Sequence, residues 1–294
     1  MSTLTATSPA PGAAHPTTSP YRLTFAHILR SEWIKFWTLR STIWTLASTV
    51  VVMAGISFLA VFFTARAADN QVGRNNGGPD MGSILHDPSI VLGGTGMAQL
   101  AIAVLGVLVI TGEYSTGMIR STLTAVPRRL SALWAKALVL TVVAAVTAVV
   151  SIAVSWAVTL PTLRANHAAL DLGDSETQRI LLGGVLYIVG IALLSFAIGA
   201  LLRHSAAALA TVLGLLLVVE NVFRSIPAAF FRNVSPFLPS TAGQQITATQ
   251  ATIDSMRESS TATVLGAWQG YGVMMLWVVV LLAAGAVLLR RRDA

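Results

Sequence analysis

The chain has 294 residues, of which 54% are hydrophobic and only 11% are charged. Soluble domains carry about 25% charged residues, so this composition excludes an ordinary soluble enzyme or binding domain and indicates an integral membrane protein. The formal net charge of +7 would suggest a nucleic-acid partner in a soluble chain. Here the basic residues border long apolar runs, so membrane topology explains the charge and we expect no nucleic acid.

Several kinds of chemistry are missing from the sequence. There is no cysteine, which rules out disulfides and thiolate metal sites. The only two lysines, Lys35 and Lys136, do not follow glycine, whereas a P-loop needs Gly-Lys-Ser/Thr to hold phosphates. The five histidines lie in separate segments, and no nucleophile elbow is present. We therefore expect no catalytic site, metal or cofactor in this chain.

The first 40 residues predict two different segments. Residues 1–20 are rich in Ser, Thr, Pro and Ala, which is typical of a disordered tail, here cytoplasmic, and residues 21–294 form one membrane domain. Arg22–Arg40 predicts an amphipathic helix in the headgroup plane, or alternatively the frayed end of a longer span. The predicted apolar stripe of this helix consists of Phe25, Ala26, Leu29, Trp33, Phe36 and Trp37.

Six apolar runs are each long enough to cross a bilayer, for which about 20 residues suffice. The predicted spans are residues 42–63, 90–111, 137–160, 180–202, 206–223 and 271–289. With both termini in the cytosol, 12 of the 19 Lys and Arg residues but only three acids lie on the cytoplasmic side. This positive-inside bias predicts an all-α, multi-pass protein of the plasma membrane with cytoplasmic N- and C-termini.

Two connecting segments carry further predictions. The third helix should begin near Leu130, with Trp134 and Lys136 in the cytoplasm or the interface. The long external segment Arg224–Gly270 should form short helices before the last span, with Gly243–Ser260 as a polar surface helix.

The stretch Gly112–Lys136 is a basic loop between the second and third spans. Apolar residues recur within it at helical spacing, which predicts a short amphipathic helix along the membrane surface. The residues that form this pattern are Met118, Ile119, Leu123 and Val126. The loop either fixes the topology alone or also docks a cytoplasmic partner, and its residues favour neither reading.

Glu220 is the only carboxylate inside an apolar run, and Arg224 follows it by four residues. One reading is an interfacial ion pair along one helix face, because residues four apart are neighbours on a helix. The other is a polar contact near the outer mouth of a substrate path.

The order of these elements resembles a membrane (permease) subunit of a type-two ABC exporter, of the kind abundant in actinobacteria. The matching stretches are LRSEWIKFWTLRSTIW, LGVLVITGEYSTGMIRSTLTAVPRRLSALWAKAL, FLPSTAGQ and the closing LLRRRDA, within Arg22 to Ala294. The second stretch is the most specific, since it combines Glu-x-x-x-Gly with a later Pro-Arg-Arg and Lys.

This resemblance implies an N-terminal elbow helix, a coupling helix between spans two and three, and short external helices before span six. The coupling helix would sit in a cleft of a separate cytoplasmic ATPase subunit, which would bind ATP and magnesium. By motif, the candidates for this interface are Glu113, Tyr114, Thr116, Gly117, Met118 and Arg120.

The implied function is the export of a hydrophobic or amphipathic substrate, such as a drug, a peptide antibiotic or a lipid. The expected partners are the ATPase, membrane lipids and a second permease copy, because six helices enclose a path poorly. One alternative is an ATP-independent secondary transporter, although buried ionisable groups at mid-membrane, common in that class, are missing. Another is a non-transporting sensor or immunity subunit.

Overall fold

The computed structural model describes residues 24–71, 81–115, 117, 129–168, 170–260 and 262–292. Throughout these residues the regular structure is helical, with no strand. Six of the described helical stretches are long and apolar enough to cross a membrane, which confirms the prediction of six spans. They are α2 (Arg40–Gln71), η1 with α4 (Pro88–Leu92 and Thr95–Ser115), α6 (Arg129–Ala165), α7 (Ser175–Leu202), α8 to α9 (Ser205–Ser225) and α13 (Ala267–Arg292).

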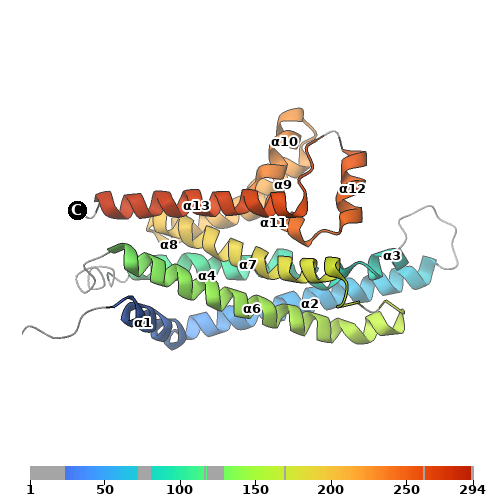
Figure 1. Cartoon of the computed structure of the whole chain (residues 1–294), viewed down its shortest axis with the longest axis horizontal. Coiled ribbons are helices and arrows are strands. Elements are labelled where there is room, and N and C mark those ends of the chain that lie inside the picture. The colour runs from blue at the N-terminus through green and yellow to red at the C-terminus, as the bar shows by residue number, and fades with distance from the viewer. Residues whose placement is uncertain are drawn as a thin grey trace, which may run out of the picture.

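The long helices run side by side along the longest axis of the molecule (Figure 1). One end carries α1 (Phe25–Thr38), the start of α6, the α7–α8 junction and the last turn of α13, and we call it the α1 end. The opposite end carries α3 (Met81–Leu85) and α12 (Gln250–Ser259), and we call it the α12 end. The predicted coupling helix falls in 118–128, and the predicted tail in 1–20, both outside the described residues.

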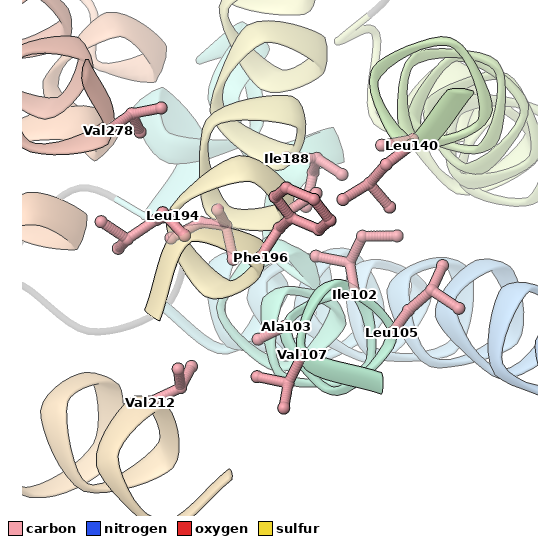
Figure 2. Packing of buried hydrophobic residues seen from close by; sticks show 14 of the residues in the cluster. Ile102, Ala103, Leu105, Val107, Leu140, Ile188, Leu194, Phe196, Val212 and Val278 are labelled. Atoms are coloured by element: carbon pink, nitrogen blue, oxygen red, sulfur yellow. The ribbon is translucent and has the colours of Figure 1, made fainter. Parts of the chain in front are cut away.

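Helix α7 is the centre of the bundle. It packs against α4, α6, α8 and α13, and a much larger share of its apolar stretch is buried than in α2 or α13. Figure 2 shows Phe196 and Leu194 of α7 surrounded by side chains from α4, α8 and α13. The outer helices instead expose large apolar side chains such as Trp44, Val51 and Leu276. Such surfaces are stable only when lipid or another protein covers them.

Small residues set how closely the central helices approach one another. A Cβ added to Gly94 of the second span would lie 2.1 Å from the Met53 carbonyl oxygen of α2. A Cβ added to Gly106 of α4 would lie 2.5 Å from the Ala192 carbonyl oxygen of α7. Contacts this short are possible only without a side chain, which is the usual reason for small residues at helix contacts in lipid.

Helix α1 packs on α6 through a face that differs from the predicted apolar stripe. Its buried residues are Ile28, Glu32 and Phe36, whereas Phe25, Trp33 and Trp37 are exposed. The exposed aromatic side chains fit a helix that lies in the membrane interface, where Trp is favoured. The buried acid Glu32 has no place in an apolar stripe and requires a partner.

The segment between the fifth and sixth spans folds as α10 (Ala229–Val234), η3 (Ser235–Phe237), α11 (Pro239–Gln244), η4 (Gln245–Thr247) and α12. The predicted surface helix over Gly243–Ser260 is wrong in its first part, because Gly243 and Ile246 are buried and α12 begins only at Gln250. Close packing explains the difference. A Cβ added to Gly270 of α13 would lie 2.3 Å from the Ala242 carbonyl oxygen of α11.

The fifth span is one helix with a π-helical segment, Gly214–Val219, between α8 (Ser205–Leu213) and α9 (Glu220–Ser225). The amide of Glu220 donates to the carbonyl of Leu215, five residues back. Such single-turn π segments accommodate an extra residue and are frequent near functional sites.

We predict that Gly106→Ala lowers the melting temperature in detergent, because the added methyl group has to separate α4 from α7. Overpacking of this kind costs about 1 to 3 kcal/mol. The matched control is Gly96→Ala on the same helix, where nothing lies within 4 Å of the added Cβ. The control should melt like the wild type or higher, because alanine favours helix over glycine. If both variants had the same melting temperature as the wild type, this would contradict the close packing of α4 against α7.

Candidate functional site

Two acidic and two basic side chains meet at the α1 end. We call them the charge cluster, and they are Glu32, Lys35, Glu113 and Lys136. Lys136 binds Glu113 at 2.7 Å and also binds Glu32. Lys35 lies 3.0 Å from Glu32 and 3.1 Å from Glu113. The side chains of Lys136 and Glu32 are each 5% exposed, and that of Lys35 is 34% exposed. Lys136 is therefore the inner cation and Lys35 the outer one.

The charge cluster connects three helices around one loop. Glu32 and Lys35 belong to α1, Glu113 lies in the last turn of α4, and Lys136 lies near the start of α6. Helix α4 ends at Ser115 and α6 begins at Arg129, so Glu113 and Lys136 stand on either side of 116–128. Both flanks of this loop are thus tied to α1 and to each other.

Two carboxylates and two ammonium groups balance the charge of the cluster. Burial lowers the pKa of Lys35, but hydrogen bonds and attraction from Glu32 and Glu113 outweigh it, so its pKa is raised overall. Lys35 therefore stays protonated through the physiological range, and its stabilising contribution is lost as the pH rises from its ordinary pKa through its raised pKa. One carboxylate oxygen, Oε2 of Glu113, is buried and accepts no hydrogen bond from the described residues.

A second contact holds the end of α4. The guanidinium of Arg203 lies over the ring of Tyr114, 5.4 Å from its centroid, and donates to the Leu288 carbonyl of α13 at 3.2 Å. Arg203 ends α7 in the left-handed conformation, with φ of 56°. The flank of the loop is thereby linked to α7 and α13 as well as to α1 and α6.

A polar network crosses the bundle nearer the α12 end, and we call it the outer polar network. The hydroxyl of Tyr187 on α7 donates to Gln99 of α4, contacts the Ser240 hydroxyl at 2.8 Å and accepts from Gln244 at 3.1 Å. Glu220 accepts the Ser240 amide at 2.8 Å. These bonds join α4, α7 and α9 to α11, so they fix the buried part of the segment between the fifth and sixth spans.

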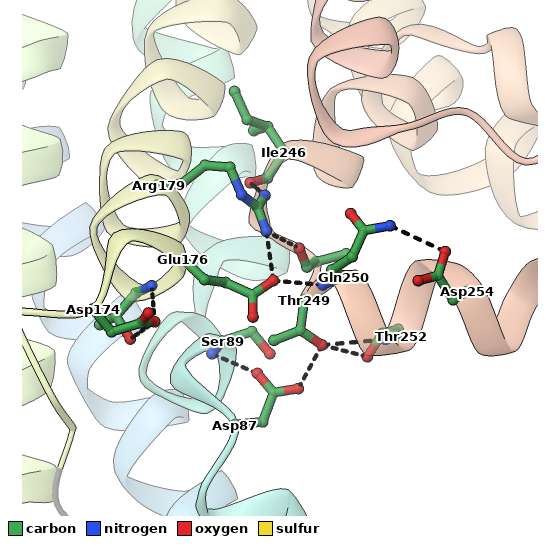
Figure 3. A network of polar contacts seen from close by, with 12 residues as sticks. Asp87, Ser89, Asp174, Glu176, Arg179, Ile246, Thr249, Gln250, Thr252 and Asp254 are labelled. Atoms are coloured by element: carbon green, nitrogen blue, oxygen red, sulfur yellow. Dashed lines mark hydrogen bonds and ion pairs between the residues drawn. The ribbon is translucent and has the colours of Figure 1, made fainter.

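Figure 3 shows a third set of contacts, which holds α12 against the bundle. Arg179 of α7 donates to the carbonyls of Ile246 and Ala248, both at 2.9 Å, and pairs with Glu176 at 3.1 Å. Glu176 in turn accepts the amide of Gln250, the first residue of α12. Asp174 caps the start of α7, and the hydrogen bond from the Thr177 amide lowers the pKa of Asp174.

The family model described as ABC-2 family transporter protein matches residues 26–294. The chain belongs to the ABC-2 transporter family. No curated protein matches the sequence in a direct search. Membership makes this chain the multi-pass permease subunit of an ABC transporter, and it implies a partner ATPase subunit in general.

The structure of this ABC-2 permease places only part of the predicted ATPase-coupling set. Glu113 is in the charge cluster, Tyr114 lies under Arg203, and Gly117 is exposed with φ of 72°. A positive φ of this size favours glycine, which fits a turn directly after α4. Thr116, Met118 and Arg120 lie outside the described residues, and the coupling role of the whole set stays a prediction.

The structure bears on two predictions about charged residues. Lys136 is buried at the α1 end, where Glu32 and Glu113 are its partners, and its position in the cytoplasm or the interface stays a prediction. The sequence predicted a direct ion pair between Glu220 and Arg224 as one reading. In the described residues the two side chains are instead connected through the Thr241 hydroxyl. The Thr241 hydroxyl donates to Glu220 at 3.2 Å and accepts from Arg224 at 3.0 Å. The role of Glu220 and Arg224 in a substrate path stays a prediction.

Sequence reasoning missed Glu32, Lys35 and Lys136 as partners of Glu113. A signal for them was present, since the only two lysines of the chain each lie between apolar neighbours. Lysine is rarely buried unless it is paired, so a lysine in such a setting indicates an acidic partner.

We predict that Lys136→Met destabilises the permease by roughly 3 to 5 kcal/mol, because two buried carboxylates then share only the outer Lys35. Thermal melting in detergent measures the loss. A second substitution, Glu113→Gln, should restore much of it by balancing the remaining charges. Lys35→Met, which removes the more exposed cation, serves as the milder comparison. Equal melting of Lys136→Met and the wild type would contradict a buried charge cluster.

Proposed function

We propose that the chain is the membrane half of an ATP-driven exporter in the plasma membrane, with the α1 end in the cytosol. In this proposal a cytoplasmic ATPase subunit, which binds ATP and magnesium, docks on the loop between Glu113 and Lys136. A second permease copy completes the path, and the substrate is hydrophobic or amphipathic. The observation that carries the proposal is the charge cluster on both flanks of the docking loop.

The charge cluster supports coupling because it resists separation of the helices that it joins. Pulling Glu113 away from Lys136 would leave charged groups unpaired in a site that excludes water, which is strongly unfavourable. A push on the loop is therefore passed to α1, α4 and α6 together rather than absorbed by one helix end. Tyr114 and Arg203 extend the same connection to α7, the central helix.

The two remaining parts of the proposal rest on surface chemistry. The exposed apolar faces of α2 and of the fifth span, which is only 22% buried, offer area for a second copy as well as for lipid. The described wall of the bundle is apolar, and this suits a lipid-like or drug-like substrate better than an ion.

The orientation can be tested by labelling, because the chain has no cysteine of its own. Single substitutions Ser115→Cys at the end of α4 and Ser255→Cys on α12 place one exposed thiol at each end. In whole cells a membrane-impermeant maleimide should modify only Ser255→Cys. Both variants should react after permeabilisation. Modification of Ser115→Cys in intact cells would contradict cytoplasmic docking.

The coupling role predicts that Glu113→Gln, or substitution of Met118–Arg120, lowers export per ATP hydrolysed by about fivefold or more. Membrane insertion should stay intact, as judged by the amount of protein in the membrane. The matched control is Glu258→Gln, which neutralises an exposed acid on α12 at the opposite end. Unchanged export and unchanged stimulation of the ATPase in the Glu113 and Met118–Arg120 variants would overturn the proposed role.

The rival functions are separated by purification followed by transport into vesicles. An exporter should co-purify with a P-loop ATPase and move substrate only with ATP. A secondary transporter would move substrate without ATP, and a sensor or immunity subunit would bind the ATPase but move nothing.

A further inference from the structure

A cavity of about 680 Å³ opens at the α12 end, and we call it the outer cavity. Its walls come from α9, α10, α11 and α12 and from the chain that leads into α13. Ligand pockets of roughly 300 to 1,000 Å³ hold molecules of drug or lipid-fragment size, so the volume is sufficient for a specific ligand.

The lining of the outer cavity combines positive charge with apolar surface. Arg224 and Arg232 line it, and among the described residues no acidic side chain does so. The apolar part of the wall includes Phe223, Ile226 and Met256. Hydroxyl groups of several Ser and Thr residues complete the lining. This pattern suits a molecule with an anionic group at one end and hydrocarbon at the other.

Both arginines are available to such a ligand. Arg232 is exposed, and no acid pairs with it in the part of the chain that the structure describes. Arg224 is also exposed, and within the described residues its hydrogen-bond acceptors are neutral oxygens, Thr241 at 3.0 and 3.3 Å and Gln244 at 3.5 Å. The nearest buried acid is Glu220, which stands behind Thr241 and accepts hydrogen bonds from the wall. The two arginines therefore make the described lining positive, while Glu220 and Asp87, which accepts the Ser89 amide at 2.8 Å, bond to the wall from behind.

A cluster of phenylalanines lies beside the outer cavity, at the end of the fifth span. Phe223 in its wall packs against Phe231, with ring centroids 4.9 Å apart, and the neighbouring Phe230 is 65% exposed. An exposed apolar cluster beside the end of a span favours contact with the hydrocarbon of the surrounding lipid. A ligand with a hydrocarbon chain can therefore reach the cavity from the adjoining leaflet.

We propose that the outer cavity binds an anionic lipid-like amphiphile from the leaflet around the α12 end. Arg224 and Arg232 hold its charged headgroup, since guanidinium groups bind phosphate and carboxylate through paired hydrogen bonds. Phe223, Ile226 and Met256 contact its hydrocarbon chain. This binding needs neither an ATPase nor transport. The proposal can therefore be tested independently of the proposed exporter function.

The test uses the full chain, purified alone in a neutral detergent, with phosphatidylglycerol and phosphatidylcholine of the same acyl chains as probes. Native mass spectrometry or a fluorescence titration measures the two dissociation constants. Phosphatidylglycerol should bind at least tenfold more tightly. Arg224→Gln and Arg232→Gln should each weaken its binding about tenfold, since each removes one charged hydrogen-bond donor.

Two further substitutions make the assignment specific. Glu220→Gln keeps a hydrogen-bond acceptor for Ser240 but removes the negative charge behind the wall, so phosphatidylglycerol should bind more tightly. Arg164→Gln changes an exposed arginine of α6 at the same end that does not line the cavity, and binding should not change. If Arg224→Gln lowers the melting temperature, the test rests on Arg232→Gln. The Arg232 side chain is exposed and makes no ion pair in the described residues, so its removal should not destabilise the fold.

Three results would overturn the proposal. The first is equal binding of the two lipids by the wild type. The second is a loss that follows Arg30→Gln instead, because Arg30 lines a separate apolar cavity of about 370 Å³ between α1 and α6. The third is binding of glycerol phosphate as tightly as the intact lipid, which would indicate a plain anion site.

Discussion

The structure depends on the mutual neutralisation of four charges at the α1 end. Glu32, Lys35, Glu113 and Lys136 come from three helices, and none of these helices could bury its own charge alone. Burial of a single ion is strongly unfavourable, so the cluster is stable only when α1, α4 and α6 are in place together. This requirement turns an interfacial helix, a loop flank and a membrane span into one unit.

The opposite end is built by a different principle, which is close backbone contact. Gly243 and Gly270 let α11 lie against α13, and the buried hydroxyl of Tyr187 then satisfies the polar side chains that α11 brings with it. The segment between the fifth and sixth spans is therefore partly an extension of the core rather than a loose cover. The positive outer cavity exists because this segment is fixed at its base by α11 and at its far side by α12.

Much of the fold could be predicted because the length of an apolar run is a local property. The six spans and the helix α1 followed directly from such runs and from the placement of Trp and basic residues, whereas the interfacial position of α1 stays a prediction. The charge cluster could not be predicted in this way, since Glu32 and Lys136 are 104 residues apart in sequence. Gln244 and Gln245 indicated a surface helix because they are polar, whereas Gln244 in fact donates to Tyr187 and Ser240 inside the bundle. Pairing between distant polar groups decides such cases, and a single sequence carries little information about it.

The π segment Gly214–Val219 determines the direction in which the side chains in the second half of the fifth span point. An α-helix advances about 100° per residue, so one spare residue turns everything that follows by that angle. Without the extra residue, the carboxylate of Glu220 would point away from α11, towards another face of the fifth span. The Ser240 amide would then lose its hydrogen-bond acceptor. The π segment thus sets the rotation of α9 about the helix axis relative to α8. The two halves of the fifth span therefore present their side chains in independently set directions.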